Sequence, residues 1–114
     1  MNREVAQRVL DDVSAVADAR MRFMIGGWLV YVEDVLVGQI QEATLFIKET
    51  SFSTGFAPDL DRLPPYEGAR PAVVVPESAR QDPVWLSQLI QGTLTALRAT
   101  KPATRRAGRK APRA

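Results

Sequence analysis

The amino-acid sequence predicts an α+β domain, in which an N-terminal and a C-terminal helix pack on one face of an antiparallel sheet. Three observations support this fold class. Apolar residues recur at three- and four-residue steps near both ends, they alternate with other residues from about residue 21 to residue 50, and the turns predicted in that segment span two residues. The expected order is helix, three-stranded meander, loop, two short strands and helix, which forms two layers.

The first predicted element is an amphipathic helix over residues 3–19. Its apolar side consists of valines at helical spacing, namely Val5, Val9, Val13 and Val16. Its other side is charged, with Arg3, Glu4, Arg8, Asp11, Asp12 and Asp18. Because valine is a weak helix former, this helix needs a packing partner.

The apolar period changes to two at Met21, which predicts the sheet. We expect Met21–Val32 to be one strand, with a bulge or a close backbone approach at Gly26 and Gly27. The rest of the predicted meander is a turn at 33–34, a strand at 35–41, a turn at 42–43 and a strand at 44–50. Two-residue connections make these strands antiparallel neighbours.

Residues 51–63 are predicted as a loop with one helical turn, because Ser, Thr, Gly, Pro and Asp are mixed there with single apolar residues. A short edge strand is expected just after Pro64 and Pro65. A second short strand is expected at Ala72–Val75, again at an edge, because prolines flank it on both sides.

The last helix has the clearest start signal in the chain. Asp82 is the expected N-cap and Pro83 the first helical residue, where a missing N–H does no harm. The apolar face comprises Val84, Trp85, Leu86, Leu89, Ile90, Leu94 and Leu97. Pro102 is expected to end the helix at about Thr100.

The composition excludes several classes of function. The 114 residues include neither cysteine nor histidine, so disulfides, thiolate nucleophiles, Cys/His zinc sites and histidine bases are excluded. We expect no enzyme activity, no cofactor and no metal. The N-terminal segment lacks a signal-peptide core, and the longest apolar run, residues 24–32, is well short of the ~20 residues of a membrane span. A cytoplasmic protein without membrane contact is predicted.

Few polar residues are candidates for a site. Glu33 and Asp34 are adjacent, so they do not converge for acid–base chemistry. Asp59 and Asp61 lie in the predicted loop and suit a turn. Lys48 is expected to project from the polar face of the third strand into solvent. A ligand-dependent function would require a polar cleft lined by Lys48, Glu33 or Asp59.

Two further features favour structural over functional interpretations. Trp28 and Trp85 lie on apolar periodic faces, so core packing is favoured over stacking on a base or sugar. The pair Gly26-Gly27 is not followed by a helix N-terminus, so it is a weak signal for phosphate binding, and backbone accommodation is favoured.

Charge divides the chain into two parts. Of the 15 Lys and Arg residues, six lie in residues 101–114, which contain no acid. Residues 1–100 therefore contain nine basic and 13 acidic residues, which gives a net charge of −4. We predict one domain over 1–100 and a disordered basic tail over 101–114. The tail cations are Lys101, Arg105, Arg106, Arg109, Lys110 and Arg113. They are candidate nucleic-acid contacts, and a solubilising or vestigial extension is the alternative.

Several short motifs resemble the N-terminal domain of the TfoX/Sxy competence regulators. Residues 23–32, Phe-Met-Ile-Gly-Gly-Trp-Leu-Val-Tyr-Val, are similar to its Arg-Met-Phe-Gly-Gly-x-x-x-Tyr-Leu opening. Further similar pieces follow in order: Leu-Val-Gly-Gln-Ile at 36–40, Thr-Leu-Phe-Ile-Lys at 44–48, Pro-Tyr-Glu-Gly at 65–68, Val-Val-Val-Pro-Glu at 73–77 and Asp-Pro at 82–83. The resemblance spans about residues 3–98.

The chain departs from the family pattern at a few positions. Ile25 stands where the family usually has Phe, and Phe23 where it has Arg. Glu33-Asp34 replaces the Asp-Gly of the family's hairpin, and Thr50 stands where an acid is common. The motif residues that match are interpreted as structural: Met24, Gly26, Gly27, Tyr31, Lys48, Tyr66 and Pro76.

The resemblance implies a two-layer fold like that of secretion chaperones and no catalytic activity. In the full-length bacterial regulators this domain precedes a helical C-terminal domain, whereas here the predicted domain is followed by the basic residues 101–114. We therefore expect a non-enzymatic regulatory module that acts through a protein partner, with a homodimer compatible with the fold. The alternative is a protein that associates weakly with nucleic acids through its tail.

Overall fold

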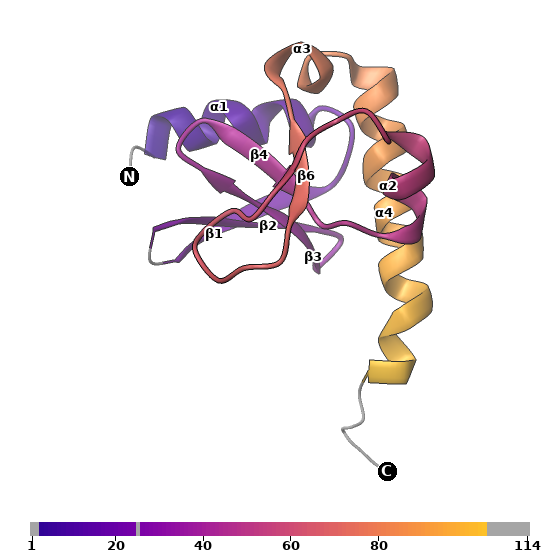
Figure 1. Ribbon diagram of the computed structural model, residues 1–114. Coiled ribbons are helices and arrows are strands. Elements are labelled where there is room, and N and C mark those ends of the chain that lie inside the picture. Colours follow the sequence, from indigo (N-terminus) through magenta and orange to yellow (C-terminus); the bar gives the residue numbers. More distant parts are fainter. Residues whose placement is uncertain (1–2, 25, 105–114) are drawn as a thin grey trace.

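A computed structural model describes residues 3–24 and 26–104 of the chain (Figure 1). Within these ranges it contains one antiparallel sheet of six strands and four helices, which confirms the α+β class. The strands are β1 (Ala19–Met24), β2 (Gly27–Val32), β3 (Val35–Gln41), β4 (Thr44–Ile47), β5 (Arg62–Leu63) and β6 (Ala72–Val75). The helices are α1 (Arg3–Ser14), α2 (Ser51–Phe56), α3 (Glu77–Arg80) and α4 (Pro83–Thr104). The order in the sheet is β1-β2-β3-β4-β6-β5.

The predicted first strand is two strands. β1 and β2 form a hairpin in which Met24 pairs with Gly27, and Gly26 has a φ of 88°, which glycine adopts without strain. The interpretation as one bulged strand was wrong, because apolar residues continue across the turn and the period of two does not mark the chain reversal. The expected close backbone approach is confirmed at Gly27, where an added Cβ would lie 2.8 Å from the Ile40 carbonyl oxygen.

The remaining meander matches the prediction in its connections. Turns occur at 33–34 and 42–43, and Glu33, Asp34 and Glu42 all have positive φ. The pairing of β2 with β3 shifts register between Val30 and Tyr31, which pair with Gly38 and Leu36, so the ladder contains a bulge at this point. α1 ends at Ser14, five residues before its predicted end, because the following segment turns into the additional strand β1.

The middle of the chain differs more. The predicted helical turn is α2, which begins with a reciprocal pair of hydrogen bonds between Thr50 and Ser53. The strand expected after the prolines lies before them, as β5. β6 has its predicted bounds, but it lies between β4 and β5. Its flanking prolines are outside residues 72–75, so the strand keeps N–H groups for both neighbours.

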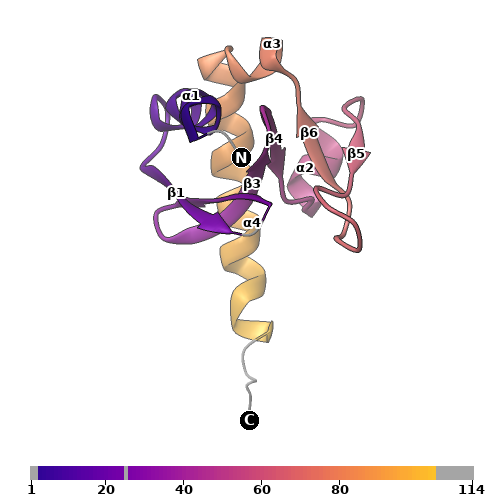
Figure 2. The same cartoon turned by 90° about the vertical axis from the view of Figure 1, so that its left-hand side faces the viewer.

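Helix α4 begins as predicted and ends later. The Asp82 carboxylate accepts a hydrogen bond from the Trp85 N–H at 3.2 Å. The helix continues past Pro102 to Thr104, so the predicted end at about Thr100 is wrong. Pro102 lies within the last turn, where its missing N–H costs one hydrogen bond and few helical residues follow. Figures 1 and 2 show α4 running beyond the edge of the sheet. Arg105, Arg106, Arg109, Lys110 and Arg113 lie outside the described residues, as does the side chain of Lys101.

Helices α1 and α4 cover one face of the sheet, as predicted, and form the core with it. Fully buried side chains converge there from both layers: Val9 and Val13 of α1, Leu86, Leu89, Ile90 and Leu94 of α4, and Val30, Val32, Ile40, Leu45, Ile47, Val73 and Val75 of the sheet. The two tryptophans also pack against this core. Trp28 is buried beside Phe23, and partly buried Trp85 lies 5.5 Å from the ring of Phe56. The core interpretation of both tryptophans is confirmed.

Candidate functional site

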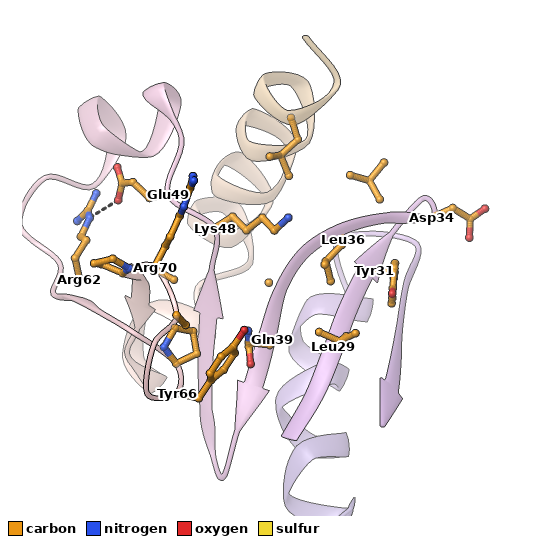
Figure 3. Close-up of a pocket in the computed structure, with 17 residues that line it drawn as sticks. Leu29, Tyr31, Asp34, Leu36, Gln39, Lys48, Glu49, Arg62, Tyr66 and Arg70 are labelled. Atoms are coloured by element: carbon orange, nitrogen blue, oxygen red, sulfur yellow. Dashed lines mark hydrogen bonds and ion pairs between the residues drawn. The ribbon is translucent and has the colours of Figure 1, made fainter. Parts of the chain in front are cut away.

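The face of the sheet away from the helices carries a groove, which we call the open-face groove. Side chains alternate along a strand, so residues next to the buried valines of β2 emerge on this face. The pairing of β2 with β3 places Leu29 beside Gln39 and Tyr31 beside Leu36. All four side chains are half-buried and line the groove (Figure 3). They form a floor of two apolar, one aromatic and one amide side chain.

The walls of the groove come from segments outside the meander. Lys48 follows directly after β4, and Tyr66 and Arg70 belong to the connection between β5 and β6. Leu97 of α4 also lines the groove. The groove encloses about 1020 Å³, which is the size of a large ligand site. Figure 3 shows the Lys48 side chain extending across it toward Leu36.

The two acids of the groove are paired with arginines. Asp34 accepts a hydrogen bond from Arg20 at 3.3 Å, and Glu49 accepts one from Arg62 at 2.5 Å. Lys48 and Arg70 make no ion pair with any residue in the described part of the chain. Partial burial lowers the pKa of the Lys48 ammonium group. The groove is therefore electropositive at these two side chains.

Arg62 anchors the loop that borders the groove. Its Nη1 donates to the carbonyl oxygens of Ala57 and Leu60, at 2.5 and 2.7 Å, and its Nη2 to that of Ser53 at 3.0 Å. Its Nε donates to Glu49, and this hydrogen bond is the main reason that the pKa of the Glu49 carboxyl lies below its ordinary value. The hydroxyls of Ser53 and Thr54 donate to the same carboxylate. The guanidinium and Glu49 thus fix the path between α2 and β5.

The seven residues singled out by the resemblance divide between two places and one outlier. Tyr31, Lys48 and Tyr66 meet in the open-face groove, although they are far apart in the sequence. Met24, Gly26 and Gly27 lie at the β1–β2 turn. Pro76 precedes α3 and lines a separate cavity of about 390 Å³ between α1 and β6.

Of the three residues expected to line a polar cleft, one lines the groove and two do not. Lys48 does line a polar cleft, but Glu33 and Asp59 do not. Glu33 is paired instead with Arg98 of α4 at 2.8 Å. Asp59 and Asp61 are exposed in the loop before β5. Glu33 thus lies in a turn, and Asp59 and Asp61 lie in a loop, as the sequence predicted.

Sequence reasoning missed Arg62, Arg70, Gln39 and Leu36 as residues of this region. Leu36 and Gln39 could have been identified from the sequence, because they pair across β2 and β3 with Tyr31 and Leu29, which alternate with the buried residues of β2. Arg62 and Arg70 have no such signal, because only the folded loops bring them to the sheet.

The described residues contain no group of three or more acids that could hold a metal ion. In the same part of the chain, no helix has both the length and the apolar character needed to cross a membrane. Compared with protein-family models, curated proteins and solved structures, the chain matches none of them.

Proposed function

We propose that this protein is a non-enzymatic, cytoplasmic regulatory module that binds a partner protein through the open-face groove. The observation that carries the proposal is the composition of the groove. Leu29 and Leu36 offer apolar surface on the sheet face opposite the packed helices, and tyrosines and cations line the same groove. Tyrosine and arginine side chains beside apolar surface are enriched in protein interfaces.

Exposure of individual side chains supports a protein partner. Tyr66 is 50% exposed, although it stands beside an apolar floor. A tyrosine gains free energy when its ring is buried, and its hydroxyl can still reach water or a polar partner at the interface rim. Tyr31 is already covered in part by Arg20, whose guanidinium carbon lies 4.6 Å from the ring centre.

The resemblance to the TfoX/Sxy domain points to the same class of function. Tyr31, Lys48 and Tyr66 are three of the seven residues on which that resemblance depends, and all three line the groove. A family that acts on transcription through other proteins needs a recognition surface of this kind.

Affinity capture from nuclease-treated native lysate tests the proposal. Three immobilised proteins are compared: the wild type, Leu36→Glu in the groove and Val84→Glu as a control. Val84 is 68% exposed at the start of α4 and does not line the groove. We expect a partner that the wild type and Val84→Glu retain and Leu36→Glu loses. The same proteins on all three resins would contradict the proposal, provided that thermal unfolding shows all three folded. Tyr66→Ala is a second groove variant should Leu36→Glu unfold.

A second candidate function is weak association with nucleic acids through the basic tail. It rests on the charge division, since residues 1–100 carry −4 and should repel a polyanion. Deleting residues 105–114 removes five cations and leaves α4 intact. We expect any duplex binding to vanish with the deletion, and in the intact chain to weaken with salt by roughly −0.9 log units per phosphate contact. Titration of labelled duplex at several salt concentrations measures this, and binding that survives the deletion would contradict it.

A further inference from the structure

The charge of the open-face groove is opposite to that of the domain. Residues 1–100 carry −4, yet the cations Lys48 and Arg70 are the groove charges without an ion-pair partner in the described structure. The acids Asp34 and Glu49 are each held by an arginine. A ligand entering the groove therefore meets two cations whose charge nothing in the described chain balances.

The far side of the same face is also cationic. Arg20 and Arg22 of β1 are exposed, and the register pairs them with Tyr31 and Leu29. Paired residues project from the same face of a sheet, so both arginines stand next to the groove floor. Arg20 is engaged with Asp34, whereas Arg22 has no ion pair among the described residues.

Between these two cationic rims lies an apolar and amide-bearing floor. Leu29 and Leu36 supply the apolar part. The Gln39 side-chain oxygen accepts a hydrogen bond from the Gln41 amide at 2.8 Å, so the Gln39 amide nitrogen is left to donate to a ligand. A simple inorganic anion would use the cations and leave the apolar floor wet, while a purely apolar ligand would leave the cations unused.

We propose that the open-face groove binds an extended segment of the partner protein in which acidic and apolar residues alternate. This inference rests on the proposed function and names the chemistry of its partner. In an extended peptide, alternate side chains point to opposite sides. The apolar set lies on Leu29 and Leu36. The acidic set points away from this floor, where the long side chains of Lys48 and Arg70, which belong to the groove walls, meet the carboxylates. Gln39 donates to a peptide carbonyl.

Binding of three capped synthetic peptides to the full chain tests this assignment. The probes are Glu-Phe-Glu-Leu-Glu, its basic counterpart Lys-Phe-Lys-Leu-Lys and the apolar-free Glu-Ser-Glu-Ser-Glu. Affinities come from fluorescence anisotropy, and amide chemical shifts locate the site. We expect the first probe to bind most tightly, with shift changes in β2, β3 and residues 64–71.

Variants of the cations provide the matched comparison. Lys48→Gln and Arg70→Gln should each weaken binding of the first probe roughly two- to fivefold, the usual range for an exposed charge pair. The control is Arg8→Gln, which removes an exposed cation of α1 that lines the other cavity. It should leave the affinity unchanged.

Each outcome decides the matter. Equal affinity for the serine probe, or competition by inorganic phosphate at similar concentration, would reduce the groove to a site for small anions and overturn the inference. Equal binding of the basic probe, or no binding of any probe, would overturn it as well. If the captured partner is lost with Leu36→Glu but its measured affinity is unchanged in both Lys48→Gln and Arg70→Gln, the proposed function stands and this inference fails. If Leu36→Glu captures the partner as well as the wild type does, the proposed function and this inference both fail.

Discussion

The two faces of the sheet differ in how completely the chain itself covers them. On the helix side, Val30, Ile47 and Leu89 are fully buried and meet partners from two layers. On the other side, Leu29, Tyr31 and Leu36 are half-buried and meet a groove. The strands are the same, and only the alternation of side chains separates the two surfaces. The helix side therefore carries the stability of the fold, which leaves residues on the groove side free to serve binding.

The largest expected effect is the loss of stability from a substitution on the helix side of the sheet. Leu89→Ala should lower the free energy of unfolding by about 2–5 kcal/mol, since it leaves a cavity where the leucine is fully buried. Leu36→Ala in the groove should cost no more than about 1 kcal/mol, because the side chain is already partly exposed. Urea denaturation of both variants measures the contrast. Equal losses would mean that the two faces contribute alike.

The next effect concerns how tightly α2 packs on α4. Gly92 lies in α4 against Phe52, and an added Cβ would lie 2.2 Å from the Phe52 ring. Gly92→Ala should therefore destabilise by about 1–3 kcal/mol through overpacking, despite the better helix propensity of alanine. Gly55 of α2 is the control, since an added Cβ there meets nothing within 4 Å. Gly55→Ala should stabilise by up to ~1 kcal/mol. Thermal unfolding compares them, and a stabilised Gly92→Ala would show that the contact is loose.

A pH effect of intermediate size is expected at Glu49. Hydrogen bonds from Arg62 and two hydroxyls hold its pKa below the ordinary 4.5 in the folded state. Its contribution is therefore fully present above pH 4.5 and is lost as the pH falls through the lowered folded-state pKa. Glu49→Gln should cost about 1 kcal/mol near neutral pH and make stability less sensitive to acid in that window. Parallel acid titrations of unfolding for both proteins would contradict this.

The smallest expected effect is at the β2–β3 turn. Asp34 has a φ of 66°, a conformation that costs less for glycine. Asp34→Gly should stabilise by about 0.5 kcal/mol, after the loss of its exposed ion pair with Arg20. Asp34→Ala loses the same ion pair without relieving the backbone, so it should destabilise slightly. A melting temperature that is no higher for the glycine than for the alanine variant would contradict the argument.

Local chemistry accounts for the parts of the fold that the sequence predicts well. The Asp82-Pro83 start of α4, the turns at 33–34 and 42–43 and the bounds of β6 all depend on neighbouring residues. The β1–β2 turn was missed because its flanks are apolar and continue the alternation. β5 was missed, and a strand was expected after Pro65 instead. The position of β5 is fixed by Arg62, whose partners become neighbours only in the folded chain.

The groove was only partly predictable for the same reason. Alternation alone places Leu29 and Tyr31 opposite the buried face, and the resemblance singled out Tyr31, Lys48 and Tyr66 without showing that they meet. Tyr66 and Arg70 reach the groove because the connection between β5 and β6 folds beside the sheet. No spacing in the sequence encodes that proximity.

The central claim is that the protein recognises its partner through the open-face groove. The most direct test is an amide chemical-shift map of the full chain, titrated with the partner that capture identifies. We predict that the largest changes fall on Leu29, Tyr31, Leu36 and Tyr66 and that the amides of α1 stay unchanged. Changes confined to α1, α4 or residues 105–114, with the groove unaffected, would contradict the account.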